Sequence, residues 1–201
     1  MLRAVIGLGN PGARYAQTRH NAGFMVIDEL AKRWAVTFRP GKGNYVFAKS
    51  TDRDAILMKP ATYMNHSGQA VRHLMDYYKI EAESCMLVYD DLDIPFPEIR
   101  IRKQGGAGTH RGMQSVIQHL IANDFPRTRM GIGGEQGRRL SEDFVLENYS
   151  KTDLSMLPEQ LEKAADAIEY WLKADIDNMM NRFNVNPRKA QAEDTEEENQ
   201  L

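Results

Sequence analysis

The stretch Ala4-Val5-Ile6-Gly7-Leu8-Gly9-Asn10-Pro11-Gly12 decides the fold, because a short apolar run passes directly into a glycine turn. Such a run is typical of a buried strand in an α/β protein. The polar group Thr18-Arg19-His20-Asn21 follows, and a helical pattern of apolar residues begins at Asn21. Polar side chains are therefore expected where the first strand ends, which is where open α/β sheets bind their ligands.

The three glycines of this turn, Gly7, Gly9 and Gly12, also satisfy the G-x-G-x-x-G pattern of dinucleotide-binding proteins. That interpretation requires a helix directly after the third glycine and an acidic residue at the end of a second strand, about 20 residues on. Residues 13–18 show no helical periodicity, and Asp28 and Glu29 fall inside the expected helix. A nucleotide-dependent enzyme is therefore kept only as a minor alternative.

The rest of the chain alternates between strand-like and helix-like patterns. Helical patterns cover 21–34, 67–79 and 112–122, and one long helix is predicted from about Pro158 to Phe183. Apolar runs typical of strands cover 2–8, 44–49, 55–59, 85–89, 99–102 and 128–133. This alternation predicts an α/β fold with a single domain, residues 1–186, in which helices flank both faces of a mixed, largely parallel twisted sheet.

Composition narrows the class of protein further. The chain has 201 residues and 42% hydrophobic content, and no apolar run approaches the ~18 residues of a membrane span. Its single cysteine, Cys85, lies in an apolar run, which predicts a buried thiol and no disulfide. We expect a cytoplasmic protein with no membrane partner. Residues 187–201 are rich in acids and are predicted to form a disordered tail.

Basic residues concentrate between residues 99 and 134, where only one acid, Asp124, is present. Such a cluster is the electrostatic footprint expected of a protein that binds a phosphate-bearing partner. A solvated strand face is the alternative. The cluster consists of Arg100, Arg102, Lys103, Arg111, Arg127 and Arg129.

Two further motifs follow predicted strands. Lys59-Pro60-Ala61-Thr62-Tyr63-Met64-Asn65-His66-Ser67-Gly68 offers a lip for substrate, although Asn65 or Ser67 could simply cap the next helix. Tyr89-Asp90-Asp91-Leu92-Asp93-Ile94-Pro95 places three carboxylates after a buried strand. Carboxylates so close together repel one another unless each has a partner, so we expect one to meet a histidine. A divalent metal site is the competing interpretation.

The glycine-rich loop Gln104-Gly105-Gly106-Ala107-Gly108-Thr109-His110-Arg111-Gly112 leads into a predicted helix and can bring backbone N–H groups close to an anion. Together, these motifs resemble the bacterial peptidyl-tRNA hydrolase family over nearly the whole chain, from GLGNPGARYAQTRHNAGF to TRMGIGG and DFVL. The resemblance implies hydrolysis of the ester between a peptide and the 3′-terminal ribose of tRNA. It also implies no metal, no organic cofactor, no obligate protein partner and a monomer.

By motif position, the resemblance implies that His20 is the catalytic base, with Asp90 orienting it and Asn10 and Asn65 as neighbouring amides. The chemistry agrees, because ester hydrolysis needs an activated water and a donor for the developing oxyanion. The sequence lacks the G-x-S-x-G motif of serine hydrolases. His20 precedes a helix, whose positive end favours the neutral imidazole, and Asn10 in its Gly-Asn-Pro turn can donate to the oxyanion.

The remaining site residues have assigned roles as well. Asn65 is expected to bind the peptide backbone, while Tyr15, Tyr63 and Met64 shape the walls for the peptide and the terminal adenosine. Arg102 and Arg129 match family positions that grip tRNA phosphates, and Arg100 and Lys103 belong to the same basic run. These are the predicted substrate-binding and tRNA-binding residues.

The sequence departs from the family pattern in the glycine-rich loop. Arg111 stands where most relatives have asparagine, so a guanidinium, which can donate but not accept, is placed beside the predicted base. Pro97 stands at a usual glycine position and Tyr89 at a frequent histidine position. Because of Arg111, a non-catalytic RNA-binding relative of the same fold remains the alternative function.

Overall fold

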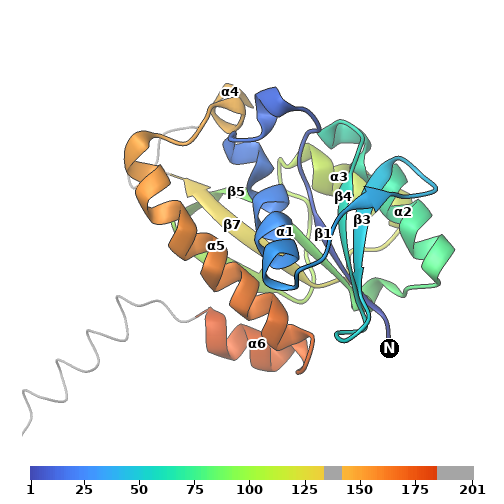
Figure 1. Cartoon of the computed structure of the whole chain (residues 1–201). Helices are drawn as coiled ribbons and strands as arrows, with labels where there is room; N and C mark the ends of the chain where they lie inside the picture. The colour runs from blue at the N-terminus through green and yellow to red at the C-terminus, as the bar shows by residue number, and fades with distance from the viewer. Residues whose placement is uncertain (134–141, 185–201) are drawn as a thin grey trace, which may run out of the picture.

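The computed structural model describes residues 1–133 and 142–184. Its strands form one seven-stranded sheet in the order β2-β3-β4-β1-β5-β7-β6 (Figure 1). Strands β4, β1, β5 and β7 run parallel to one another, while β3, β2 and β6 are antiparallel to their neighbours. The bounds are β1 Arg3–Gly7, β2 Arg39–Pro40, β3 Tyr45–Ser50, β4 Ala55–Pro60, β5 Cys85–Pro95, β6 Ile99–Arg102 and β7 Arg127–Gly133.

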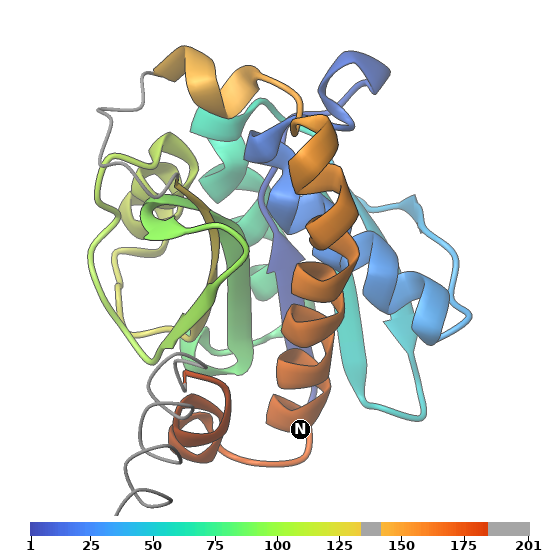
Figure 2. The same cartoon turned by 90° about the vertical axis from the view of Figure 1, so that its left-hand side faces the viewer.

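Helices cover both faces of this sheet, as Figures 1 and 2 show. One face carries α1 (Ala22–Arg33), α5 (Lys151–Trp171) and α6 (Ile176–Phe183), and the other carries α2 (Ser67–Tyr78) and α3 (Arg111–Leu120). The short helix α4 (Glu142–Leu146) lies beyond the carboxyl ends of the parallel strands. The predicted α/β fold with a mixed, largely parallel sheet is therefore confirmed.

Strand β1 shows how the sequence builds these layers. Successive side chains of a strand point to opposite faces, so Val5 packs into the cluster under α1 and α5, whereas Ala4 and Ile6 pack under α2 and α3. All three are fully buried. The continuous apolar run thus reflects a strand covered on both sides.

The glycines of the first turn serve close packing. A Cβ atom at Gly7 would lie 2.3 Å from the carbonyl oxygen of Gly23, and a Cβ at Gly23 would lie 2.3 Å from that of Val88. Only glycine therefore lets α1 begin against β1 and β5. After Gly12 the chain forms a 3₁₀ turn, Ala13–Tyr15, and no α-helix starts until Ala22. The dinucleotide interpretation consequently lacks the helix N-terminus that would hold a pyrophosphate.

The long helix predicted over 158–183 is wrong in its bounds, because the structure has two helices there. Helix α5 begins seven residues before Pro158, where Ser150 and Asp153 form a capping box. It ends at Trp171, and α6 begins after Asp175, whose side chain accepts a hydrogen bond from the Asn178 N–H (2.8 Å). The apolar stripe continues across the break, which is why periodicity alone joined the two helices.

The other predicted elements occur within a few residues of their expected bounds, except for one strand that carries a predicted site residue. The sequence ended a strand at Tyr89, but β5 continues to Pro95, and Asp90 pairs with Met130 of β7. Acidic residues are depleted in strands, so the pattern concealed this extension. The sequence analysis also did not predict β2 and α4. The predicted tail, 187–201, lies outside the described residues. None of the described helices is long and apolar enough to cross a membrane.

Candidate active site

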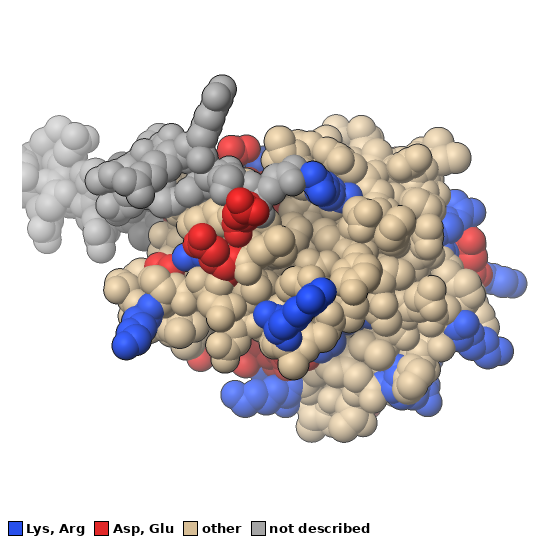
Figure 3. Space-filling model, turned by 90° about the horizontal axis from the view of Figure 1, so that it is seen from above, with Lys and Arg blue, Asp and Glu red and all other residues tan. Residues whose placement is uncertain are grey.

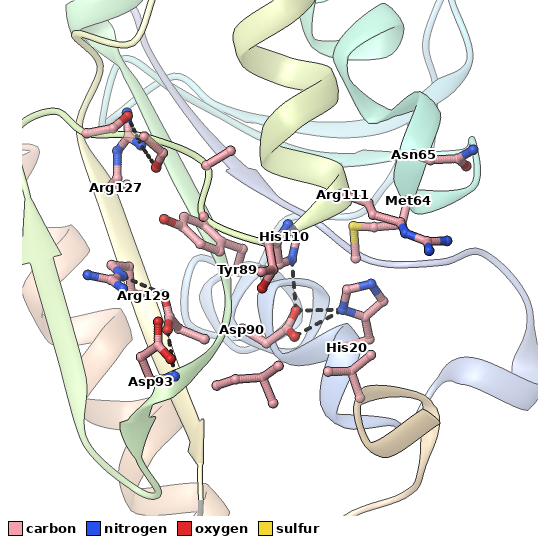
Figure 4. A pocket seen from close by; sticks show the side chains of 18 of the residues that line it. His20, Met64, Asn65, Tyr89, Asp90, Asp93, His110, Arg111, Arg127 and Arg129 are labelled. Atoms are coloured by element: carbon pink, nitrogen blue, oxygen red, sulfur yellow. Dashed lines mark hydrogen bonds and ion pairs between the residues drawn. The ribbon is translucent and has the colours of Figure 1, made fainter. Parts of the chain in front are cut away.

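A cavity of about 670 Å³ lies beyond the carboxyl ends of β1 and β4, where Asn10 and Met64 reach its wall, and beside β5, which contributes Asp90 from its middle. Figure 3 shows the molecule from above the view of Figure 1. On this face the Lys and Arg side chains lie in separate groups, some with acidic side chains close by. Inside the cavity, Figure 4 shows His20, Met64, Asn65 and Arg111 toward one end and Arg127 and Arg129 toward the other.

The structure brings His20 and Asp90 together on the floor of the cavity. His20 lies in the 3₁₀ turn Arg19–Asn21 immediately before α1, and its Nδ1 is 2.9 Å and 3.0 Å from the two carboxylate oxygens of Asp90. Asp90 is only 2% exposed. Because Nδ1 faces a carboxylate, we assign the ring proton to Nδ1, which leaves the Nε2 lone pair as the basic site of the ring.

A second histidine, His110, shares this carboxylate, and sequence reasoning did not assign it a role. Its Nε2 lies 3.1 Å from Asp90 Oδ1, and its Nδ1 accepts a hydrogen bond from the backbone N–H of Met113 (3.1 Å). His110 is therefore the N-cap of α3. Since Nδ1 accepts, Nε2 carries the proton and donates to Asp90. The position of His110 before a helix was the available signal, but histidine is not a preferred cap.

The two histidines keep Asp90 ionised. Burial alone would raise the pKa of this carboxyl, but the charges and hydrogen bonds of His110 and His20 hold it well below its usual range. Asp90 is therefore an anion between two ring donors near neutral pH. Such a carboxylate fixes the tautomer of a histidine and stabilises the imidazolium that forms when the ring accepts a proton.

These three side chains are also the one group among the described residues with the composition and spacing of a metal site. Their ligand atoms lie within 4.8 Å of one another. A metal would need the lone pair of His110 Nε2, but the Met113 N–H already occupies Nδ1 and leaves the proton on Nε2. As arranged, this group fits a hydrogen-bonded triad better than a metal cradle. The predicted alternative of a metal on Asp90, Asp91 and Asp93 also fits poorly, because Asp91 pairs with Arg129.

Asn10 is oriented by two neighbouring segments. Its side-chain oxygen accepts the Met64 N–H (2.8 Å), while Asn21 binds its backbone twice, accepting from the N–H (2.8 Å) and donating to the carbonyl (3.0 Å). Asn10 is 7% exposed and lines the cavity. With its oxygen occupied, its side chain offers the cavity an amide donor. Asn21 is a supporting residue that the sequence analysis did not identify.

The predicted peptide wall is only partly as expected. Tyr63, Met64, Asn65 and Arg111 line the cavity, and Tyr63 is 56% exposed. Tyr15 is not among the residues that line the cavity; it ends the 3₁₀ turn Ala13–Tyr15, where the Arg14 guanidinium lies 4.5 Å from the centre of its ring. A contact of Tyr15 with the substrate stays a prediction.

Helix α4 supplies a part of the wall that the sequence did not reveal. Val145 and Leu146 line the cavity from this helix, and Leu146 is 46% exposed. Arg19, next to the predicted base, holds α4 in place: its guanidinium donates to the Phe144 carbonyl (3.2 Å) and lies 4.0 Å from the centre of the Phe144 ring. The polar cluster Arg-His-Asn thus contains one residue that faces the cavity and two that support it.

The four basic residues predicted to bind tRNA divide into two that line the cavity and two that do not. Arg102 and Arg129 line the cavity, and Arg129 Nε is 2.5 Å from Asp91 Oδ2. Arg100 and Lys103 are not among the lining residues. Each is paired with an acid instead, Arg100 with Glu98 (3.5 Å) and Lys103 with Asp177 (3.2 Å).

Arg127 of this cluster has a structural role. It is 1% exposed, and its guanidinium donates to the carbonyls of Gly105 (2.7 Å), Gly106 (3.2 Å) and Asn123 (2.8 Å). These bonds hold the glycine-rich loop that leads to His110. Burying a guanidinium is costly unless its donors are satisfied, and here carbonyl groups of the loop satisfy them. The sequence offered no signal that separates this arginine from the exposed ones.

Comparison with known proteins identifies the family. Residues 4–193 match the family described as peptidyl-tRNA hydrolase. A peptidyl-tRNA hydrolase from Chloroflexus aurantiacus is 46% identical over 183 residues, which is 90% of this chain and 97% of the relative. One from Bacillus cereus is 45% identical over 185 residues, 91% of this chain and 100% of the relative.

A solved structure agrees with the sequence comparison. The crystal structure of peptidyl-tRNA hydrolase from Acinetobacter baumannii superimposes with a TM-score of 0.85 at 31% identity, and the match covers 92% of this chain and 95% of that one. The family match, residues 4–193, includes every residue that lines the cavity. The chain belongs to the peptidyl-tRNA hydrolase family.

Proposed function

We propose that this protein hydrolyses the ester bond between a peptide and the 3′-terminal ribose of tRNA, and so releases free tRNA. The observation that carries the proposal is the pair formed by His20 Nδ1 and Asp90, at 2.9 Å, on the floor of a cavity with arginines at its other end. The names of the relatives agree with it. No metal or organic cofactor is required by this chemistry.

Water is the nucleophile in the proposed reaction. No serine or cysteine is among the described residues that line the cavity, so His20 has no thiol or primary alcohol beside it to activate. His20 Nε2 accepts a proton from water while the oxygen of that water attacks the ester carbonyl carbon. When the resulting tetrahedral intermediate collapses, the bond to the ribose oxygen breaks, and the imidazolium returns the proton to that oxygen.

Asn10 is proposed to stabilise the intermediate. Its amide group is held in place before the reaction by the Met64 N–H, and its remaining donor faces the cavity. A preorganised donor of this kind stabilises a developing oxyanion by about 3 kcal/mol, because it does not have to reorient during the reaction.

The two ends of the cavity would hold the two parts of the substrate. Arg102 and Arg129 are proposed to bind tRNA phosphates, since guanidinium groups match phosphate oxygens in a bidentate manner. Met64, Asn65 and Tyr63 are proposed to receive the peptide. Contacts of this kind read the backbone and the acceptor end, which suits an enzyme that must accept every tRNA.

The decisive experiment measures tRNA release from an N-acetylated aminoacyl-tRNA by the purified protein in the presence of a chelator, with the His20→Ala variant alongside. We expect rapid release by the wild type alone and unchanged tRNA binding by the variant. The His73→Ala variant is the matched control, because His73 lies in α2 and is not among the residues that line the cavity.

The same experiment tests the non-catalytic alternative. Tight tRNA binding by the wild type without any release would contradict the proposal and favour an RNA-binding protein, with Arg111 as the first residue to replace. Release that disappears with chelator would contradict the metal-free mechanism.

A further inference from the structure

The end of the cavity proposed to hold tRNA phosphates contains acids as well as arginines. Asp91 and Asp93 line it together with Arg102 and Arg129. The Arg129 Nε donates to Asp91 Oδ2 (2.5 Å), and Asp91 Oδ1 accepts the backbone N–H of Asp93 (3.0 Å). A surface that only had to attract phosphates would exclude carboxylates, because like charges repel. The proposed reaction gives Asp91 no role.

The pair leaves one edge of the Arg129 guanidinium open. Its side chain is 27% exposed, and that of Asp91 is 12% exposed. A guanidinium has five N–H donors, of which Asp91 takes the one on Nε, whereas Nη1 and Nη2 make no hydrogen bond to any described residue. These two nitrogens can meet a phosphate in a bidentate manner while Nε still donates to Asp91. The phosphate then meets a cation whose charge a neighbouring carboxylate already offsets.

The strand register offers a second explanation for Asp91. Arg129 of β7 lies opposite Arg100 of β6, and Arg127 lies opposite Arg102. Side chains directly opposite each other in an antiparallel pair share one face of the sheet, so like charges there destabilise it. Asp91 offsets the charge of Arg129 and so relieves this repulsion. An effect on stability alone is therefore the alternative that a test has to separate.

Substrate and product carry the same phosphates in the proposed reaction. Contacts to those phosphates bind peptidyl-tRNA and free tRNA alike, and such uniform binding does not lower the barrier to ester cleavage. After cleavage the same contacts hold the free tRNA, and product release limits the turnover of many enzymes. A hold on phosphates that is weaker than the arginines alone would provide therefore favours turnover.

We propose that Asp91 promotes product release: its carboxylate weakens the hold of Arg129 on a tRNA phosphate, so that free tRNA leaves the cavity after cleavage. The carboxylate is bonded to Arg129 and to the Asp93 N–H, whereas the two histidines are bonded to Asp90. Asp91 thus acts on binding and not on the proton transfers of the reaction. The inference rests on the function proposed above, since it requires Arg129 to meet a tRNA phosphate.

Asp91→Asn tests the inference, because it removes the charge and keeps the shape of the side chain. The amide oxygen can still accept from Arg129 Nε, so the guanidinium keeps its direction. Dissociation of fluorescently labelled, deacylated tRNA, followed by stopped flow, should slow about fivefold, and the affinity for this tRNA should rise by a similar factor. Ester cleavage in a single turnover, with the enzyme in excess, is measured alongside, and the change should lie in release rather than in cleavage.

Asp76→Asn is the matched control. Asp76 also pairs with an arginine, Arg72 (2.9 Å), but both residues lie on α2 and neither lines this cavity. The control removes one acid from an arginine pair and changes the net charge of the protein by the same amount. It should leave the dissociation of tRNA as in the wild type, so that a general effect of net charge can be recognised.

A double-mutant cycle shows whether Asp91 acts through Arg129. Arg129→Ala alone should weaken tRNA binding, and Asp91→Asn added to it should change the dissociation rate less than about twofold. If Arg129→Ala binds tRNA as tightly as the wild type, the proposed contact of Arg129 with tRNA fails, and the inference fails with it. If Arg129→Ala weakens binding but Asp91→Asn does not slow dissociation, the proposed function stands and only the inference fails.

Two further results would overturn the inference. If Asp91 only relieves the repulsion between Arg100 and Arg129, Asp91→Asn should unfold at a lower temperature and release tRNA at the wild-type rate. If Asp91 instead directs Arg129 toward the phosphate, the variant should release tRNA faster than the wild type. Thermal unfolding and the dissociation rate, measured on the same preparations, distinguish both results from the slower release expected here.

Discussion

Two regions of the site are built in different ways: the floor of the cavity, formed by Asn10, His20 and Asp90, and the basic side chains in and beside it, here called the rim, which are Arg100, Arg102, Lys103 and Arg129. On the floor, Asp90 is 2% exposed and fixed by two histidines, and Asn10 is fixed by Asn21 and Met64. The basic side chains are more exposed, and three of them pair with acids: Arg129 of the cavity lining with Asp91, and Arg100 and Lys103, outside the lining, with Glu98 and Asp177. Groups of the first kind are preorganised, whereas those of the second kind are held weakly and can exchange partners.

This difference separates chemistry from binding. Changes on the floor should reduce turnover and leave tRNA affinity intact, because the side chains there hold protons and donors in place without facing the tRNA. Changes on the rim should do the reverse. The variants below are ordered by the size of the effect that we expect, and each would break this separation if it altered both quantities together.

Asp90→Asn should have the largest effect, a loss of turnover of about a thousandfold or more. The amide can donate to His20 Nδ1 and so favours the wrong tautomer, with the proton on Nε2. Steady-state tRNA release and equilibrium tRNA binding check the result. An equal loss of binding would contradict the assignment of Asp90 to the floor alone.

The same carboxylate predicts a pH effect on stability. Its pKa is lowered in the folded protein, so it stabilises the fold above its unfolded pKa of about 3.9, and this contribution is lost as the pH falls toward the folded value. Thermal unfolding of the wild type should therefore lose stability below about pH 4 more steeply than that of Asp90→Asn. Parallel curves would show that Asp90 is not held by the histidines.

Asn10→Ala should follow, with turnover lower by about a hundredfold, as expected for removing one oxyanion donor. KM should change little, because the donor acts mainly on the charge that develops in the transition state. Asn21→Ala is the matched variant: it leaves the Asn10 amide in place but frees its backbone. It should give a smaller loss, and a larger one would assign the main role to Asn21.

Only some of the residues on the floor of the cavity could be predicted from the sequence. Sequence reasoning placed Asn10 and Asp90 near the ends of apolar runs, and the resemblance to the family, by motif position, assigned His20, Asp90 and Asn10 their roles. Neither identified the role of His110, which depends on a contact between segments far apart in the chain.

The fold followed more directly from the sequence than the site did. Alternating apolar runs and helical stripes predicted the order of the layers, because a sheet covered on both faces requires that pattern. The break between α5 and α6 was not predicted, since capping by Asp175 competes with an apolar stripe that runs through it. Local polar contacts, such as those of a cap, leave only a weak trace in apolar periodicity.

Arg102→Ala tests the rim within the cavity. We expect tRNA binding to weaken about tenfold and the dependence of log affinity on log salt to become shallower by about one counterion, with turnover at saturation unchanged. Filter binding at several salt concentrations measures both. Arg72→Ala is the control, because Arg72 is an arginine of α2 that does not line the cavity and pairs with Asp76 (2.9 Å).

Lys103→Ala should have the smallest effect, and it decides how far the tRNA surface extends. Lys103 belongs to the same basic run as Arg102, but it lies outside the cavity, and its ammonium is 3.2 Å from Asp177. An exposed pair of this kind contributes about 0–1 kcal/mol, and its acid already offsets much of the charge that a phosphate would meet. We therefore expect affinity for tRNA to fall less than about threefold at physiological salt.

Asp177→Asn sharpens the same prediction, because it frees Lys103 from its acid without changing the lysine. If the rim ends at the cavity, this variant should bind tRNA as the wild type does. If it binds more tightly and Lys103→Ala weakens binding as much as Arg102→Ala, the tRNA surface continues along β6 toward α6, and the acids paired with its basic residues act to limit affinity for tRNA.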